Sequence, residues 1–207
     1  MTMSDIEVHS IYPTPIYVAD GFMLSEEKQN RLIEETSADS QQNFHGNFTS
    51  NNRFILERDY LSELREHLHL HVNKYAHEVF KITSTVKFYI TQSWLNINNK
   101  GEGHHLHNHA NSFFSGTYYI KGETPLFFKK NVDSFQNFDF DINGYNQFNS
   151  TNCSFPIQPG KCILFPSALQ HFVNPNETDT QRVSLSFNCF FKGEPKTKED
   201  FATYLKI

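Results

Sequence analysis

The chain has 207 residues, of which 38% are hydrophobic and 20% charged, and its formal net charge at pH 7 is -5. This length predicts one domain with a substantial core. The acidic balance offers no basic patch of the kind that binds nucleic acid, so we expect no nucleic-acid partner. The 21 Phe and nine Tyr raise the aromatic content to 15%, which indicates an aromatic, strand-rich core.

The N-terminal residues and the cysteines indicate the compartment. Residues 1–20 contain no charged start followed by an apolar run, so we expect no signal peptide. No stretch approaches the ~18 apolar residues that a membrane-spanning helix needs. The three cysteines, Cys153, Cys162 and Cys189, are odd in number and form no Cys-x-x-Cys pair. This usage is typical of reduced thiols, and it predicts a cytoplasmic protein without a membrane partner.

The first third of the chain is predicted to contain one edge strand and two helices. Residues 11–18, IYPTPIYV, indicate a short strand that two prolines confine to a sheet edge. Residues 24–37 indicate a helix with Ser25 as N-cap, and the polar segment 37–52 indicates a loop. Apolar residues at three- and four-residue spacing then predict a helix over about 60–80. Its buried stripe would comprise Leu61, Leu64, Leu68, Val72, Tyr75 and Val79.

From residue 86 onward the pattern changes to short runs rich in β-branched and aromatic residues. Turn residues such as Pro159-Gly160 separate these runs, which are expected to be strands. They cover residues 86–98, 112–120, 125–130, 153–158, 161–166, 170–174 and 182–191. Helices followed by mostly antiparallel strands predict a mainly β fold, a double-stranded β-helix of the jelly-roll type with helices packed outside. The polar segment 131–151 is expected to be a long loop over one mouth of the barrel.

Three histidines have the spacing of a metal site between two strands. Alternate residues of a strand share a face, so His107 and His109 are expected to point together into the barrel. His171 begins a later strand that pairs near the first in a jelly roll. Three such ligands leave positions open for a cosubstrate and oxygen on non-haem Fe(II), although three neutral histidines also suit zinc or copper. His104 and His105 could line the mouth, support a ligand, or replace His109.

The segment RVSLSFNC predicts a strand with one polar and one apolar face. Arg182, Ser184, Ser186 and Asn188 alternate with apolar residues and are expected to face the barrel interior. A buried arginine requires an anion, and a guanidinium binds a carboxylate through two parallel hydrogen bonds. We interpret Arg182 with Ser184 as a clamp for an organic acid; a structural pair with Asp or Glu is the alternative.

Neighbouring predicted strands add three further candidates to this acid site. The Tyr119 hydroxyl would reach the same carboxylate as Arg182 if Ser115, Thr117 and Tyr119 face inward. Asn96 would meet the other end of the acid, and Asn188 lies on the polar face. Asn96 and Asn188 could equally satisfy backbone groups at strand ends.

Together these residues make the chain similar to a known family. The segments IYPTPIY, WLNIN with GEGHHLHNHANSFFSGTYYI, PGKCILFPSALQHFVNPN and RVSLSFN occur in the expected order over nearly the whole sequence. The chain thus resembles the Fe(II)/2-oxoglutarate-dependent oxygenase superfamily, in particular its small bacterial and phage members. The resemblance implies one domain over 1–207, with an N-terminal strand and helices in 1–82 and a jelly-roll core in 83–193.

The resemblance also implies roles for individual residues. His107 falls on the first ligand position, His171 on the distant ligand, and Arg182 with Ser184 on the motif that binds the far carboxylate of 2-oxoglutarate. Tyr119 matches a strand tyrosine that serves the same carboxylate. Most members have an acid where this chain has His109. If His109 did not bind, the resemblance implies a vacant position that could accept a halide, as in related halogenases.

We therefore predict an Fe(II)- and 2-oxoglutarate-dependent dioxygenase. It would use O2 to hydroxylate a small molecule or a side chain, releasing succinate and CO2. One alternative is a three-histidine, cupin-type dioxygenase that needs no 2-oxoglutarate. Another is a non-catalytic metal- or ligand-binding barrel. A homodimer is one assembly that the sequence leaves open.

Overall fold

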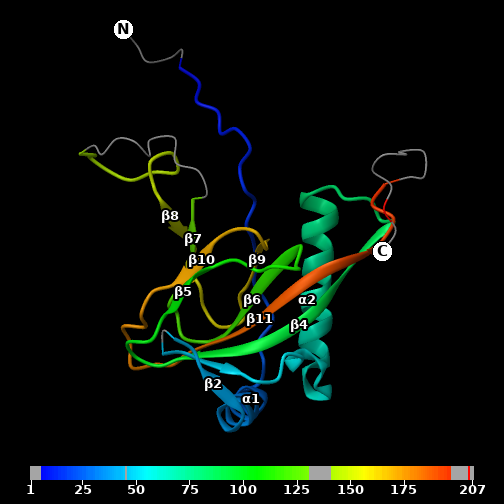
Figure 1. The fold of residues 1–207 in the computed structure, drawn as a ribbon, viewed down its shortest axis with the longest axis vertical. Coiled ribbons are helices and arrows are strands. Elements are labelled where there is room, and N and C mark those ends of the chain that lie inside the picture. Colours follow the sequence, from blue (N-terminus) through cyan, green and yellow to red (C-terminus); the bar gives the residue numbers. More distant parts are fainter. Residues whose placement is uncertain (1–5, 45, 131–140, 197–204, 206–207) are drawn as a thin grey trace.

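The fold consists of two antiparallel β-sheets with the helices packed against the larger one (Figure 1). The computed structural model describes residues 6–44, 46–130, 141–196 and 205. The larger sheet has the strand order β1-β9-β6-β11-β4-β3-β2, and the smaller sheet has the order β5-β10-β7-β8. Every pairing of neighbouring strands in these sheets is antiparallel. This arrangement confirms the predicted mainly β, double-stranded β-helix class.

Most strands lie where the sequence predicts them. The larger sheet contains β1 (Tyr17–Ala19), β2 (Ser40–Gln42), β3 (Phe48–Ser50), β4 (Val86–Asn98), β6 (Phe114–Lys121), β9 (Cys162–Pro166) and β11 (Arg182–Gly193). The smaller sheet contains β5 (His104–His107), β7 (Phe127–Lys129), β8 (Asn152–Ser154) and β10 (His171–Val173). Strands β1, β2 and β3, all from the first 82 residues, complete the larger sheet.

The interpretation of residues 37–52 as a loop is wrong, because β2 and β3 form a hairpin there. The buried residues of β3, Thr49 and Ser50, are polar, so the hairpin lacks the apolar alternation that marks a strand. Of the loop predicted at 131–151, residues 131–140 lie outside the described residues, and 141–151 form turns and bends.

Two helices, α1 (Glu26–Ala38) and α2 (Ser62–Lys74), pack against the larger sheet. The predicted N-cap of α1 is confirmed, since the Ser25 hydroxyl accepts a hydrogen bond from the Lys28 amide at 3.3 Å. Single 3₁₀ turns, η1 (Ile55–Glu57) and η2 (Asp59–Leu61), precede α2. None of the helices in the described ranges is long and apolar enough to cross a bilayer.

The last turn of the second helical region is a π-helix, η3 (Tyr75–Val79). The predicted stripe is buried as far as Tyr75, but Val79 is 44% exposed, so its place in the stripe is wrong. A π-turn bonds each residue to the fifth rather than the fourth along the chain, which rotates the following side chains away from the α-helical stripe. Ala76 is buried in this turn instead.

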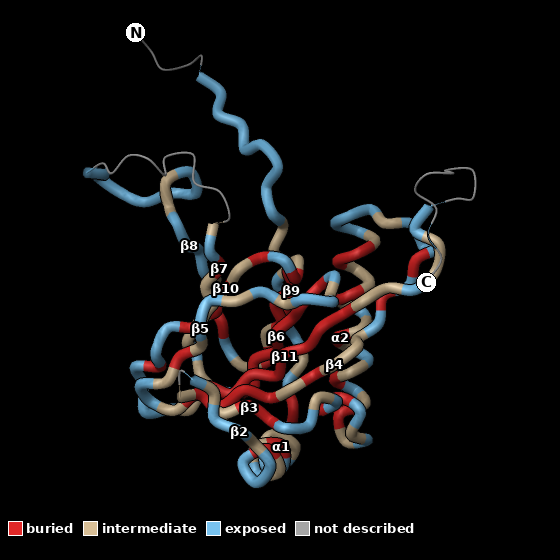
Figure 2. The backbone as a smooth tube through the Cα atoms, in the orientation of Figure 1, coloured by how far each residue is buried: buried red, intermediate tan, exposed pale blue. Residues whose placement is uncertain are grey.

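Two apolar clusters of the described residues fill the molecule, one on each side of the larger sheet. Figure 2 shows that the buried backbone runs along the central strands of that sheet. The first lies between α2 and the sheet, where the apolar face of β11 supplies Val183, Leu185, Phe187 and Cys189. The second lies between the two sheets and includes Tyr119, Phe128 and Phe165. The predicted separation of β11 into an apolar outer face and a polar inner face is thereby confirmed.

A β-bulge in β4 changes which of its residues face the barrel interior. Gln92 pairs with Asn188 and Ile90 with Cys189, so Thr91 is the extra residue. Before the bulge Phe88 packs toward the helices, and after it Leu95 does. The half of β4 after the bulge therefore presents Trp94 to the interior cavity.

Two of the three cysteine thiols are buried and one is exposed. Cys162 and Cys189 are buried in the helix-side cluster, and burial raises the pKa of each thiol. Cys153 is exposed on β8. All three are free thiols, as the sequence predicts.

Leu68 and Leu70 on α2 provide a matched test of the helix-side core. Leu68 is fully buried, whereas Leu70 is 52% exposed. We expect Leu68→Ala to lower the free energy of unfolding by about 2–5 kcal/mol, because it leaves a cavity against the sheet. Leu70→Ala should change it by less than ~0.5 kcal/mol. Urea unfolding monitored by circular dichroism measures both; equal effects would contradict this packing of α2.

Candidate metal and acid-binding site

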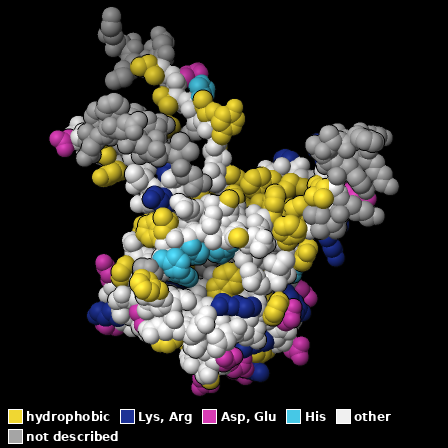
Figure 3. Space-filling model, in the orientation of Figure 1, with side chains coloured by type: hydrophobic (Ala, Val, Ile, Leu, Met, Phe, Trp, Pro, Cys, Tyr) yellow, Lys and Arg dark blue, Asp and Glu magenta, His cyan; other side chains and the backbone are white. Residues whose placement is uncertain are grey.

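Three histidines converge on one point between the sheets. His107 ends β5 and pairs directly with His171, which begins β10. His109 lies two residues beyond β5, so the expectation that it continues the strand is wrong. One ligand nitrogen from each of the three lies within 4.8 Å of the other two. Figure 3 shows histidine side chains gathered beside a hollow on this face of the molecule.

Backbone hydrogen bonds of the His107 and His171 imidazoles determine which ring nitrogen of each is free to bind a metal. The Nδ1 atom of His107 lies 2.8 Å from the His105 carbonyl oxygen, and that of His171 lies 2.9 Å from the Leu169 carbonyl oxygen. A carbonyl oxygen only accepts, so each Nδ1 carries the proton and each Nε2 keeps its lone pair. Metal-binding histidines are commonly oriented in this way.

His109 is held by side chains rather than by a strand. Its Nδ1 atom lies 2.5 Å from the Asn188 side-chain oxygen and 2.8 Å from the Ser115 hydroxyl. Its backbone N–H donates to the Ser167 carbonyl oxygen at 3.0 Å. The proton is again on Nδ1, which leaves Nε2 free. Asn188 thus accepts a hydrogen bond from His109.

The Nε2 atoms of His107 and His109 lie 3.2 Å apart. With both protons on Nδ1, this contact places two lone pairs opposite each other, which is unfavourable unless a cation lies between them. Two nitrogens that bind one ion at right angles through bonds of about 2.1 Å would lie about 3 Å apart. The donor set therefore fits a divalent transition metal.

Burial keeps these imidazoles neutral at physiological pH. It lowers the pKa of His107 to about 4 and that of His171 to about 3, and in both cases neighbouring histidines contribute to the decrease. Burial also lowers the pKa of His109. A metal competes with protons for imidazole nitrogen, so low pKa values favour binding at neutral pH.

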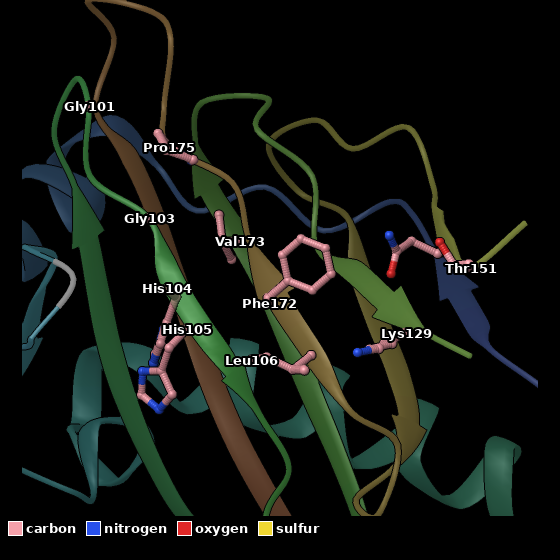
Figure 4. Close-up of a pocket in the computed structure, with 11 residues that line it drawn as sticks. Gly101, Gly103, His104, His105, Leu106, Lys129, Thr151, Phe172, Val173 and Pro175 are labelled. Carbon is pink, nitrogen blue, oxygen red and sulfur yellow. The ribbon is translucent and has the colours of Figure 1, made fainter. Parts of the chain in front are cut away.

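A second histidine group overlaps the first. His104, His105 and His107 also place one nitrogen each within 4.8 Å of the others. The side chains of His104 and His105 lie together at one edge of β5 (Figure 4), with ring centroids 5.1 Å apart. Both groups use His107, so they are alternatives. His105 is exposed, whereas no member of the group with His109 and His171 is.

Arg182 is buried in the barrel interior without an acidic partner. Its exposed fraction is 3%, and it forms no ion pair with a carboxylate of the described residues. Its guanidinium donates to the Ser184 hydroxyl at 2.8 Å and to the Thr124 carbonyl oxygen at 2.9 Å. Desolvation lowers the pKa of Arg182. The alternative of a structural Arg–Asp or Arg–Glu pair is therefore not observed in this part of the chain.

Tyr119 lies beside this guanidinium. The Arg182 side-chain carbon Cζ is 5.3 Å from the centre of the Tyr119 ring. The Tyr119 hydroxyl is buried near the Arg182 guanidinium and the Leu126 backbone, but none of the described residues meets hydrogen-bonding geometry to it. An unpaired buried hydroxyl is costly, so it marks a position where a ligand would be stabilised.

Three rows of polar side chains cross β4, β11 and β6 toward the interior. The register aligns Asn96 with Ser184 and Tyr119, then Trp94 with Ser186 and Thr117, then Gln92 with Asn188 and Ser115. The first row lies nearest Arg182, and the third row holds His109. One cavity is lined by Arg182, Ser184 and Asn96 together with the histidines at positions 104, 107, 109 and 171.

The amide of Asn96 is engaged by protein groups within this cavity. Its oxygen accepts from the Thr49 hydroxyl at 2.9 Å, and its nitrogen donates to the Ser186 hydroxyl at 3.1 Å. Thr49 lies on β3, and the sequence interpretation missed it because its segment was expected to be a loop. No local pattern announces this contact, since it arises from the pairing of β3 with β4.

Comparisons with known proteins agree with this geometry. Residues 92–188, which contain all three histidines and Arg182, match a family model described as "Putative 2OG-Fe(II) oxygenase". No match is found among curated protein sequences.

Several solved structures share the fold. One is an oxidoreductase of the 2OG-Fe(II) oxygenase family from Burkholderia pseudomallei, at 12% identity and TM-score 0.54, covering 84% of this chain and 83% of that one. A second is a prolyl-4-hydroxylase from Pseudomonas putida. It is 12% identical with a TM-score of 0.53, and the match covers 84% of this chain and 92% of that one. A third is HygX from Streptomyces hygroscopicus with nickel, 2-oxoglutarate and hygromycin B bound. It is 12% identical with a TM-score of 0.53, and the match covers 85% of this chain and 82% of that one.

The contact between Asn188 and His109 provides a test of the metal centre. We expect Asn188→Ala to weaken Co(II) binding about 10- to 100-fold, because His109 loses the acceptor that orients it. Asn188→Asp keeps an acceptor oxygen and should bind Co(II) nearly as tightly as the wild type. The single Trp94, whose ring lies 5.5 Å from that of His109, allows Co(II) binding to be followed as fluorescence quenching.

The control for this series is Asn73→Ala, which removes an amide that bonds within α2. Unchanged affinity in Asn188→Ala, with the fold intact by circular dichroism, would contradict the role of Asn188 in orienting His109 on the ion.

The buried histidines also predict a pH dependence of stability. Their pKa values in the folded, metal-free protein lie below the ordinary value of about 6.5, so at lower pH the unfolded chain binds protons that the folded chain does not. The histidine contribution to stability is therefore complete above about pH 6.5 and falls as the pH drops toward about 3. Urea unfolding in the presence of a metal chelator, repeated at several pH values, measures this slope of the free energy of unfolding against pH.

A histidine outside the proposed ligand set tests the origin of this slope. Burial lowers the pKa of His104 to about 3, so His104→Gln should make the pH dependence shallower. An equally steep slope in His104→Gln would contradict the assignment.

Proposed function

We propose that this chain is a member of the Fe(II)/2-oxoglutarate-dependent oxygenase superfamily, because residues 92–188 match the family model, and we propose which residues carry its chemistry. His107, His109 and His171 would hold Fe(II). Arg182, Ser184 and Tyr119 would hold the far carboxylate of 2-oxoglutarate. The reaction would consume O2 and 2-oxoglutarate, release succinate and CO2, and hydroxylate a second, small-molecule or side-chain substrate.

The observation that carries this proposal is the buried cation Arg182, which has no counter-ion among the described residues and lies in the same cavity as three free imidazole nitrogens. An anion that spans the cavity would satisfy both ends at once. A guanidinium binds a carboxylate through charge-assisted hydrogen bonds, which are roughly twice as strong as neutral ones. The Tyr119 hydroxyl would gain its missing partner from the same carboxylate.

The charges of the site also suit 2-oxoglutarate. Three neutral histidines leave the 2+ charge of an iron ion uncompensated by the protein, and Arg182 adds one positive charge. The two carboxylates of 2-oxoglutarate offset most of this charge. No Asp or Glu lines the cavity in the described part of the chain, so no protein anion competes with the ligand.

Aromatic side chains restrict water on the inner side of the histidines. The Phe165 ring lies 4.7 Å from that of His171, and the Phe128 ring lies 5.1 Å from that of Phe165. Leu126 and Val173 line the same cavity. Excluding water strengthens the electrostatic contacts of Arg182 and protects oxidation chemistry from side reactions.

The bound iron would supply the oxidising chemistry, as cofactors do in such enzymes, while the protein orients its ligands. His107 and His171 are oriented by backbone carbonyl groups, and His109 by Asn188 and Ser115. Ser184, bonded to the guanidinium, fixes the direction in which Arg182 presents its remaining donors.

Replacement of Arg182 tests the assignment of the keto acid. Loss of one partner of a buried charge pair costs about 2–5 kcal/mol, so we expect Arg182→Gln to weaken 2-oxoglutarate binding at least ~30-fold. Succinate formation at low 2-oxoglutarate should fall accordingly. Arg182→Lys keeps the charge but loses the planar fork and should be intermediate.

Controls separate this loss from misfolding and from other reactions. Both variants should bind Co(II) with wild-type affinity by Trp94 fluorescence, because Arg182 is not a metal ligand. Normal succinate production by Arg182→Gln would contradict the proposal. Substrate-dependent O2 consumption without 2-oxoglutarate would instead indicate a three-histidine dioxygenase of the cupin type.

A further inference from the structure

We propose that a second cavity beside the histidines binds the substrate to be oxidised, and that Arg53 holds a carboxylate of that substrate. This inference rests on the proposed function, because the cavity is a substrate site only if the histidines hold the metal. It identifies the substrate class as small, polar carboxylic acids. It also assigns a specificity role to a residue outside the ligand-binding strands.

The cavity opens directly next to the proposed ligands. Its volume is about 350 Å³, within the range of small-molecule sites, and His107 and His109 form part of its wall. Arg53, Gln92 and Trp94 form another part. A substrate here would lie against the outward side of the histidines, whereas Arg182 lines the inner cavity.

The Arg53 side chain has no partner in the described part of the chain, unlike the other arginines. Its guanidinium makes no hydrogen bond, ion pair or ring contact with any of the residues that the structure describes. The other four arginines all have partners: Arg31 and Arg58 pair with Glu35, Arg65 donates to the Leu56 carbonyl oxygen, and Arg182 donates to Ser184. A half-buried guanidinium without partners is suited to a ligand that brings its own anion.

The backbone around Arg53 is anchored to the sheet that carries the site. The Arg53 carbonyl oxygen accepts from the Ser93 N–H at 2.7 Å, and Phe54 forms a bridge with Ser93. Ser93 is the neighbour of Trp94 on β4. Arg53 is therefore positioned by the strand that lines the cavity rather than by a free loop.

The charge of the cavity favours an anion. No Asp or Glu is among the described residues that line it, and Arg53 is its only Lys or Arg. In Figure 3 a basic side chain lies across the hollow from the histidines. An acid in place of His109 would put a negative charge at the wall of this cavity, whereas a neutral histidine does not repel a carboxylate.

The remaining wall indicates a polar body on the substrate. Gln92 and Asn43 provide amide groups, and the Asn43 nitrogen is held by the Thr49 hydroxyl at 2.7 Å. Trp94 provides an aromatic surface 5.5 Å from the His109 ring. A substrate with its carboxylate on Arg53 would direct its other end toward the histidines.

A larger groove on the smaller sheet does not meet these conditions. It is lined by Leu106, Phe172 and Val173 and by Lys129 (Figure 4). Neither His109 nor His171 is part of its wall. A substrate bound there would not contact the complete set of proposed ligands.

The single Trp94 makes the test direct. Full-length protein loaded with Zn(II) and saturated with 2-oxoglutarate is titrated with N-acetyl amino acids and with their matching amides, while Trp94 fluorescence is recorded. We expect at least one acid to bind saturably and its neutral amide to bind about 10-fold more weakly or worse, since a charge-assisted pair contributes roughly 1.5–3 kcal/mol. Glycerol phosphate and glycerol form a second pair that tests phosphate as the anion.

The matched variants are Arg53→Gln and Arg31→Gln. Both remove one positive charge, but Arg31 lies on the surface of α1, with its side chain 58% exposed and paired with Glu35. We expect Arg53→Gln to lose the preference for acid over amide and Arg31→Gln to keep it. Arg53→Lys should retain part of it.

Three outcomes would overturn the proposal: equal binding of acids by Arg53→Gln and the wild type, equal binding of acids and amides, or no saturable response to any acid. An Arg53-dependent response to glycerol phosphate alone would overturn the carboxylate class. Calorimetry of 2-oxoglutarate binding distinguishes a failure of the Arg53 substrate site from a failure of the proposed function. Normal 2-oxoglutarate binding with no effect of Arg53→Gln refutes only the substrate site, whereas Arg53-dependent acid binding without 2-oxoglutarate binding refutes only the cosubstrate.

Discussion

The pairing of β11 between β4 and β6 is the constraint on which the rest of this structure depends. The strand is buried on both faces, so every second side chain must fit the apolar layer under α2 and every other one must fit a polar interior. Its register with both neighbours aligns polar residues in rows across the sheet. A shift of one residue would exchange the two faces, so the fold and the site are specified by the same alternation.

Burying polar rows is costly, and the interior offsets this cost mainly through mutual hydrogen bonds. Asn96 is bonded on both sides, and Asn188 accepts from His109 and Ser115. The free imidazole nitrogens and the Arg182 guanidinium, which has no counter-ion among the described residues, line one cavity, and the unsatisfied Tyr119 hydroxyl belongs to the residue beside that guanidinium. Under the proposed function, a metal ion at the histidines and a ligand carboxylate at Arg182 would satisfy these groups.

The sequence predicted the parts of this arrangement that follow a local period. Strands β4 and β11 and the inward face of Arg182 follow from alternation, and the N-cap of α1 from Ser25. The β2–β3 hairpin was missed because its buried residues are polar. The place of His109 beyond the strand end, and of Asn188 against it, could not be predicted, because both depend on register between distant segments. Arg53 was missed for the same reason, since it reaches the cavity through the bonding of its carbonyl oxygen and of the neighbouring Phe54 to Ser93 on β4.

The distribution of the thiols has a practical consequence for spectroscopy of this barrel. Cys162 and Cys189 are enclosed and protected from alkylating reagents, whereas Cys153 is open to solvent on β8. Strand β8 pairs with β7, which pairs with β10, the strand that begins at His171. A nitroxide attached to the wild-type chain would therefore go to one position, two strands from a proposed ligand. Its relaxation by a paramagnetic ion would locate that ion without any engineered cysteine.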